Sequence, residues 1–155
     1  MYDYNGNVIN EYEYKNGMDF SGNSVVRDSN LYYLVDENNK KISAEYSDIR
    51  TEKILKDNKT VNYYVGKKGE FKFLLSPEGK ELVSEGAKSI NVGNKYVTLE
   101  YEDSVKIYDL KNNKIILELN EKLSNIYLKD YYVEVIKDGH TSYYSYTTGK
   151  KFYTN

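Results

Sequence analysis

The side chains able to perform acid–base or metal chemistry are few in this sequence. His140 is the single histidine, and it ends the turn signal Asp138-Gly139-His140. A general base needs a nucleophile or a carboxylate within hydrogen-bond reach, and no local motif supplies one. With one histidine and no cysteine, the usual zinc ligands are missing. We therefore interpret His140 as an exposed turn residue and predict neither a metal site nor a cofactor.

Acidic residues gather in two short stretches and in one group of carboxylates. The segments Asp3-Tyr4-Asn5-Gly6-Asn7 and Asp36-Glu37-Asn38-Asn39 place oxygen ligands at alternate positions, but neither ends in the bidentate Glu of a full calcium loop. Glu100, Glu102 and Asp103 have the residue types of a glycosidase acid–base pair, which depends on a separation in space. Turns and solvated loops use the same residues. We predict no catalytic residue and no enzyme; a carboxylate pair facing one pocket would revive that alternative.

Tyrosines are the better candidates for a functional surface. The chain has 19 Tyr and 4 Phe but no Trp, and Tyr suits half-buried β-surfaces because its ring packs while its hydroxyl stays in water. Adjacent tyrosines recur, and neighbouring residues of a strand point to opposite faces, so each pair places one ring on either face. The pairs are Tyr32-Tyr33, Tyr63-Tyr64, Tyr131-Tyr132 and Tyr143-Tyr144.

We predict Tyr32, Tyr63, Tyr131 and Tyr143 as binding residues. One ring of each pair would then contribute to an aromatic row that stacks on sugars or contacts a protein partner. The alternative is that these rings pack between successive sheets, where both faces of a sheet are covered.

The elements that position the tyrosines follow a repeat of hairpin turns. A three-residue hairpin loop often ends in the left-handed helical region, where Gly is unstrained and Asn is the best alternative. Candidates for this position recur at intervals of 33 to 40 residues, and each has an apolar residue three places later. They are Gly6, Asn39, Gly79, Asn113 and Gly149, which we call the marker residues.

Alternating segments around the markers predict short strands. The clearest set lies at residues 89–92, 96–101, 105–109 and 114–119, and a second set lies at 125–128, 131–136, 141–146 and 150–153. Upstream we predict strands at 24–27, 31–36, 41–46, 61–65, 71–75 and 80–83, with a strand starting near 49 and a hairpin within 2–14. The longest interval between markers, 40 residues, separates Asn39 from Gly79. We predict that its extra residues form a polar loop at 56–60.

The predicted fold is all-β, with an antiparallel repeat architecture of about four and a half four-stranded units, like the blades of a β-propeller. We assign the units to one domain, 1–155, with approximate bounds 1–16 (partial), 17–47, 48–86, 87–121 and 122–155. The half unit fits a fifth small blade, a fragment of a larger propeller, or an open array. An open array exposes strand edges, so a homodimer through such an edge is one expected partner.

Composition excludes two classes of partner and leaves the compartment open. The 22 basic and 24 acidic residues nearly balance, unlike the basic footprint of a nucleic-acid-binding protein. The longest apolar run, 31–35, is far shorter than a membrane span. We predict no nucleic-acid partner and no membrane insertion. The lack of cysteine suits a cytoplasmic protein, and equally a secreted or cell-surface one if the chain is cut from a longer exported protein.

Two stretches resemble the WG-repeat family of bacterial proteins, in which a strand, a Gly-Lys turn, a second strand and a Tyr-Asp-like pair recur. They are YYLVDENNKKISAEYSDI at 32–49 and FLLSPEGKELVSEGAKSI at 73–90; the family's Trp-Gly pair is absent. The resemblance implies a β repeat scaffold that mediates binding, and no catalytic residues. YYSYTTGKKFY at 143–153 is similar, more weakly, to the cell-wall-binding repeats of bacterial surface proteins. We predict a non-catalytic binding module for a protein partner, with glycan or cell-wall binding as the alternative.

Overall fold

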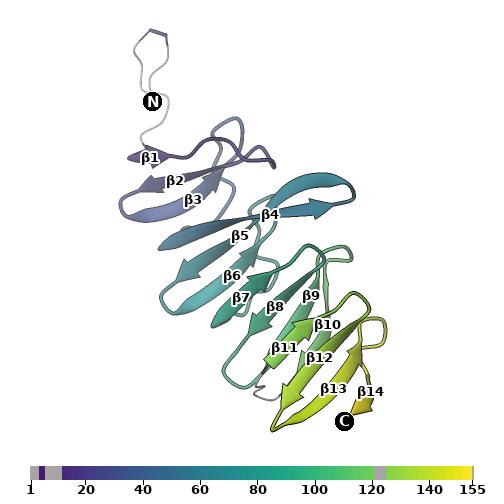
Figure 1. Ribbon diagram of the computed structural model, residues 1–155. Helices are drawn as coiled ribbons and strands as arrows, with labels where there is room; N and C mark the ends of the chain where they lie inside the picture. The colour runs from purple at the N-terminus through teal and green to yellow at the C-terminus, as the bar shows by residue number, and fades with distance from the viewer. Residues whose placement is uncertain (1–3, 6–11, 121–124, 155) are drawn as a thin grey trace. The chain divides into compact units, whose positions relative to one another are not determined.

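Every regular element in the described part of the chain is a β-strand (Figure 1). The structure is a computed structural model that describes residues 4–5, 12–120 and 125–154. Its strands form four antiparallel sheets, in which each strand pairs with the next one in sequence. The predicted all-β fold with blade-like units is therefore confirmed. The hairpin predicted around Gly6 lies largely outside the described residues. Within them, no helix is long and apolar enough to cross a membrane.

The chain divides into two compact units, which we call the N-terminal unit, Met1–Gly86, and the C-terminal unit, Ala87–Asn155. The boundary coincides with the predicted boundary between repeats at residues 86 and 87. Each unit contains two sheets and its own hydrophobic core.

Two three-stranded sheets make up the N-terminal unit. They consist of β1 (Tyr14–Lys15), β2 (Ser24–Asp28) and β3 (Leu31–Val35), and of β4 (Asp48–Lys56), β5 (Lys59–Lys68) and β6 (Phe71–Leu75). Because β1 pairs with β2, residues 14–15 belong to the sheet of the unit that we predicted to begin at residue 17.

Isolated bridges replace the fourth strand that we predicted for each of these two sheets, at residues 41–46 and 80–83. The bridges are Tyr32–Tyr46, Val35–Lys41 and Leu75–Glu81. In the first sheet the main-chain N–H of Leu34 donates to Ser43 Oγ, 2.8 Å away. A side chain therefore takes the place of a carbonyl in the ladder, and no continuous strand forms there.

The β4–β5 hairpin contains the extra residues of the longest interval. Its turn consists of Asp57 and Asn58 alone, with φ of 50° and 60°. Two successive left-handed residues are typical of the type I′ turn, whose twist matches that of the flanking strands. The ladder consequently continues to Lys56 and Lys59. The polar run at 56–60 is thus a tight turn with strand on both sides, and the prediction of a loop there was wrong.

The C-terminal unit consists of two four-stranded meanders. Their strands are β7 (Ser89–Val92), β8 (Tyr96–Glu100), β9 (Val105–Asp109) and β10 (Lys114–Leu119), followed by β11 (Asn125–Leu128), β12 (Tyr132–Lys137), β13 (His140–Ser145) and β14 (Lys151–Thr154). Each strand lies within about one residue of its predicted bounds, because alternation and turn residues agree throughout this unit. The core is formed by residues of β9, β10, β12 and β13, including Val105, Ile107, Leu117, Val133 and Val135.

The marker residues adopt the predicted left-handed conformation wherever the structure describes them. Their φ values are 61° at Asn39, 81° at Gly79, 51° at Asn113 and 66° at Gly149. The side chain that opens each turn accepts hydrogen bonds from main-chain N–H groups two to four residues later. These capping residues are Asp36, Ser76, Asp109 and Ser145.

The same backbone contact joins successive sheets in both units. A β-carbon at Gly79 would lie 2.7 Å from the carbonyl oxygen of Ile42, and one at Gly149 would lie 2.9 Å from that of Ile116. Ile42 and Ile116 are the apolar residues three places after markers Asn39 and Asn113. The repeat read from the sequence therefore corresponds to a repeated contact in the structure.

Candidate binding sites on the C-terminal unit

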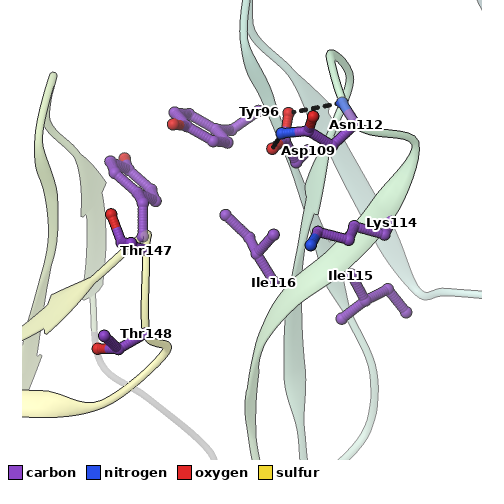
Figure 2. Close-up of a pocket in the computed structure, with 9 residues that line it drawn as sticks. Tyr96, Asp109, Asn112, Lys114, Ile115, Ile116, Thr147 and Thr148 are labelled. Carbon is purple, nitrogen blue, oxygen red and sulfur yellow. Dashed lines mark hydrogen bonds between the residues drawn. The ribbon is translucent and has the colours of Figure 1, made fainter.

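A polar cleft of about 470 Å³ lies between the β9–β10 turn and the β13–β14 turn (Figure 2). One side consists of Asp109, Asn112, Lys114, Ile115 and Ile116. The other side consists of Tyr146, Thr147 and Thr148, and Tyr96 completes the lining. We call this site the tyrosine cleft. Only the two isoleucines among its lining residues have purely apolar side chains.

Two tyrosines form a fixed aromatic wall in this cleft. The rings of Tyr96 and Tyr146 are stacked, with centroids 4.0 Å apart and planes inclined by 8°. The Tyr146 hydroxyl donates a hydrogen bond to the carbonyl oxygen of Lys129, 2.8 Å away. Burial raises the pKa of both hydroxyls, with Asp109 adding to the effect on Tyr96. Both rings therefore remain neutral hydrogen-bond donors at ordinary pH.

Asp109 serves chiefly to hold the turn beside the cleft. The residue is 8% exposed, and its carboxylate accepts hydrogen bonds from the main-chain N–H of Lys111, at 2.9 Å, and from that of Asn112, at 3.3 Å. The side-chain amide of Asn112 donates to its second oxygen at 2.6 Å, as Figure 2 shows. These donors stabilise the negative charge and orient the Asn112 amide at the wall of the cleft.

The N-terminal unit contains positions equivalent to those of the two cleft tyrosines, because its sheets follow the same repeat. Tyr96 pairs with the capping residue Asp109 across the β8–β9 ladder. Asn23 directly precedes the first pair of the β2–β3 ladder and so stands opposite the capping residue Asp36. Asn23 and Tyr96 are therefore equivalent positions in the two units.

The second tyrosine has a counterpart as well, and the comparison shows why the cleft is unusual. Tyr146 directly follows the capping residue Ser145. Pro77 directly follows the capping residue Ser76, so Tyr146 and Pro77 are equivalent positions. In the N-terminal unit, the side-chain amide of Asn23, 4% exposed, donates to the Pro77 carbonyl and to the Tyr64 hydroxyl. Hydrogen bonds close this place in one unit, whereas an aromatic stack borders an open cleft in the other. The C-terminal unit thus departs from the repeat at the tyrosine cleft.

A second aromatic group covers the outer side of the last sheet. Tyr132, Tyr143 and Phe152 come from β12, β13 and β14, and their ring centroids lie 5.4 to 6.2 Å apart. Tyr127 of β11 lies in the same row as Tyr143, since both flank Glu134 across the ladder. We call these four residues the aromatic face. Phe152 is 60% exposed and Tyr127 is 45% exposed, so the face is accessible in this unit.

The opposite side of the same sheet packs into the core. Val133, Val135 and Tyr144 alternate with the residues of the aromatic face, and each is less than a tenth exposed. The last sheet is therefore packed on one side and aromatic on the other.

The predicted binding tyrosines do not form one row. Tyr63 is 2% exposed, and Tyr32 packs against the core of the N-terminal unit, as the packing alternative describes. Tyr131 is 86% exposed beside the β11–β12 turn, and Tyr143 belongs to the aromatic face. Their role in binding stays a prediction.

Sequence reasoning missed Tyr96 and Tyr146. Neither was chosen as a binding residue, since Tyr96 begins the predicted strand 96–101 and Tyr146 ends the predicted strand 141–146. Aligning the repeats on their capping residues would have found both, because Tyr96 then replaces Asn23 and Tyr146 replaces Pro77.

The described residues considered for catalysis and metal binding lie at strand ends, as His140 and Glu100 do, or in turns and loops. His140 is exposed at the start of β13, after a turn in which Asp138 and Gly139 both have positive φ. Asp36 caps its turn, and Glu102 forms an ion pair with Lys88. Among the described residues no three His, Cys, Asp or Glu side chains group closely enough to hold a metal ion.

Comparison with known proteins yields no family. No protein-family model matches the sequence, and no curated protein matches it either. Similar solved structures include BBS1N in complex with ARL6DN, with a TM-score of 0.43 and 12% identity over 88% of this chain. BamB from Moraxella catarrhalis gives 0.40 and 12% over 86%, and a eukaryotic initiation factor gives 0.46 and 13% over 96%. This chain spans 50%, 49% and 44% of their lengths, respectively. At such scores and identities the likeness is too slight to assign a function.

Proposed function

We propose that this chain is a non-catalytic binding module that recognises a protein partner through its aromatic face. The observation that carries the proposal is the repeat itself. Three residues of the aromatic face correspond to positions of the preceding sheet that pack into the core of the C-terminal unit, whereas Tyr127 corresponds to the exposed Asn91.

The correspondence follows from the capping and marker residues. Ile107 lies two residues before its capping residue, as Tyr143 does, and Ile116 lies three residues after its marker, as Phe152 does. Ile107 is fully buried and Ile116 packs against the same core. In the preceding sheet, Ile107 and Ile116 pack against another sheet, the one that contains β12 and β13. A face of this kind is therefore covered by a sheet elsewhere in the same unit.

The chemistry of the face suits a protein surface. Tyr and Phe are enriched in protein interfaces because large, stiff rings bury much apolar area at little cost in side-chain entropy. The complementary surface in this chain consists of Val133, Val135 and Tyr144, which is a sheet side of valine and tyrosine. We expect the partner to present an apolar sheet side of the same kind. The likeness of residues 32–49 and 73–90 to WG-repeat proteins supports a binding role as well.

Site-specific crosslinking tests the proposal. Tyr143 is replaced by the photoreactive p-benzoyl-phenylalanine, and the full chain is irradiated in an extract of its source cells. We expect one protein adduct that unlabelled wild-type chain competes away and that a Tyr143→Ser, Phe152→Ser double variant does not. The matched control carries the crosslinker at Leu55, which is 58% exposed at the β4–β5 hairpin of the other unit.

Three outcomes would count against the proposal. An adduct that the double variant competes equally well would show that the aromatic face is not what the partner contacts. Equal labelling from position 55 would indicate nonspecific contact. An adduct with carbohydrate in place of protein would support the glycan alternative instead, whereas an adduct with a second copy of this chain would identify the partner as a homodimer.

A further inference from the structure

The tyrosine cleft has the properties of a ligand site separate from the aromatic face. Its lining is polar, its aromatic wall is held in place, and the equivalent position of the N-terminal unit is closed by hydrogen bonds. None of its lining residues belongs to the aromatic face. A ligand could therefore occupy the cleft whether or not a protein covers that face.

The aromatic wall is already in place before any ligand arrives. Tyr146 is held at its hydroxyl end by the carbonyl of Lys129 and along its ring by Tyr96. The stack covers one face of each ring, and an uncovered face of such an ordered ring suits the C–H side of a sugar ring, which packs on aromatic faces. Because the rings are already ordered, little side-chain entropy is lost on binding.

Short polar side chains surround the wall. Asn112 presents an amide, Thr147 and Thr148 present hydroxyls, and Lys114 presents an ammonium group that has no ion-pair or hydrogen-bond partner among the described residues. These groups can donate to or accept from the hydroxyls of a sugar. A hydroxyl-rich ligand would leave few of them unpaired, whereas an apolar ligand would desolvate them without compensation.

The charge of the cleft favours a neutral ligand. One carboxylate, Asp109, and one ammonium, Lys114, line it. The carboxylate already accepts three hydrogen bonds from Lys111 and Asn112. Within the tyrosine cleft, a polyanion would meet a single cation beside this carboxylate, and a polycation would meet a carboxylate whose oxygens are already engaged.

A second cleft shows how far the ligand can extend. It has a volume of about 310 Å³ and also lies against Tyr96, but it is lined otherwise by the end of β11 and by the β7–β8 and β11–β12 turns, including Lys95, Lys129 and Asp130. Tyr96 thus lines both clefts. A chain of sugar rings can contact Tyr96 from both clefts, over the parts of its ring that Tyr146 does not cover, which a single sugar cannot do.

From these observations we propose that the tyrosine cleft binds a neutral oligosaccharide, with Tyr96 between two subsites. Tyr96 and Tyr146 supply the stacking surface. Asn112, Lys114 and Thr147 supply hydrogen bonds to the sugar hydroxyls. The proposal goes beyond recognition of a protein and does not depend on it, since the two sites share no residue.

NMR titration of the full chain tests this proposal. The probes are neutral hexasaccharides of glucose with α1,4, β1,4 and β1,3 linkages, and of N-acetylglucosamine with β1,4 linkage. We expect saturable shifts of the Asn112 side-chain amide and of the Thr147 and Thr148 backbone amides with at least one probe. We expect the matching disaccharide to bind at least about tenfold more weakly, because it cannot fill both subsites.

Variants separate the cleft from other surfaces. Tyr96→Ala should weaken binding at least about tenfold, and Thr147→Val, which keeps the shape of an exposed turn residue, about threefold. Phe152→Ser, on the aromatic face, serves as the control and should leave affinity unchanged. No saturable shift with any probe would overturn the proposal. So would shifts centred on the aromatic face, binding unaltered in both cleft variants, or binding of acidic oligosaccharides alone.

Discussion

At the residue scale, the turn chemistry was the part of this fold most readable from sequence. Asn39, Gly79, Asn113 and Gly149 were identified because few other residues tolerate the left-handed region, and all four adopt it. What the sequence could not show was that Gly79 and Gly149 also approach a neighbouring carbonyl, because that contact depends on how two sheets pack. A glycine can thus be required for two independent reasons.

Substitution of two glycines in the N-terminal unit can separate these reasons. Gly69 has φ of 60° and open space around its missing side chain, whereas Gly79 has φ of 81° and the Ile42 carbonyl oxygen at 2.7 Å. We expect Gly69→Ala to lower the free energy of unfolding by about 1 kcal/mol, the cost of a left-handed alanine. Gly79→Ala should cost at least about 2 kcal/mol, because the main chain must also shift.

Urea unfolding followed by circular dichroism measures both changes. Wild-type chain and the two variants are compared under identical conditions. Equal losses for Gly69→Ala and Gly79→Ala would show that the contact with Ile42 adds nothing to the conformational cost.

Tyrosine burial was less predictable than the turns. Tyr63 and Tyr64 are adjacent, so alternation places them on opposite sides of β5, yet both are at most 2% exposed. Thr98 alternates in β8 with the buried Val97 and Leu99, yet it is only 6% exposed. The alternation of side chains along a strand shows which residues share a side of the sheet. It does not show whether other residues cover both sides. The choice of Tyr63 as a binding residue depended on that missing information.

At the element scale, strand bounds were predicted well where hairpins are short and less well where the chain departs from the repeat. The N-terminal unit has a long β4–β5 hairpin and a long connection between β1 and β2, and these two insertions contact each other. The Phe20 N–H donates to the Asn62 side chain at 2.8 Å, and the Asn62 N–H donates to Ser21 Oγ at 2.8 Å. No local sequence pattern predicts this contact, because the residues that make it lie about forty positions apart in the sequence.

The Ser21 hydroxyl should therefore matter more than an ordinary surface serine. It accepts from the N–H of Asn62 and donates to the carbonyl of Asn62, a residue that is 3% exposed. We expect Ser21→Ala to lower the free energy of unfolding by about 1–3 kcal/mol, because a buried N–H loses its acceptor. Hydrogen exchange should show faster exchange of the Asn62 amide in this variant.

Ser47→Ala is the matched control for this prediction. The Ser47 hydroxyl donates to the Lys67 carbonyl at 2.9 Å but is exposed, so water can replace it. We expect a loss within about 0.5 kcal/mol. A loss as large as that of Ser21→Ala would mean that burial does not distinguish the two hydroxyls.

At the scale of the whole molecule, the repeat predicted the four sheets but not their grouping into two compact units. The residues that form the two cores are alike in type, namely Val, Leu, Ile and Tyr, so composition offers no sign of a division. The grouping depends on which sheets share a core. That information resides in tertiary packing, and the local periods that identify strands do not carry it.

Separate cores predict that damage to one unit stays within it. Ile107 is fully buried in the core of the C-terminal unit, and truncation to alanine typically costs about 2–5 kcal/mol. We expect Ile107→Ala to accelerate hydrogen exchange of amides in β7–β14 and to leave those of β2–β6 unchanged, as followed by mass spectrometry of peptic fragments of the full chain. Leu34→Ala, which truncates an equally buried residue of the other core, should give the converse pattern. Loss of protection throughout the chain in either variant would instead show that the two cores unfold as one cooperative structure, and the division into units would then have no energetic counterpart.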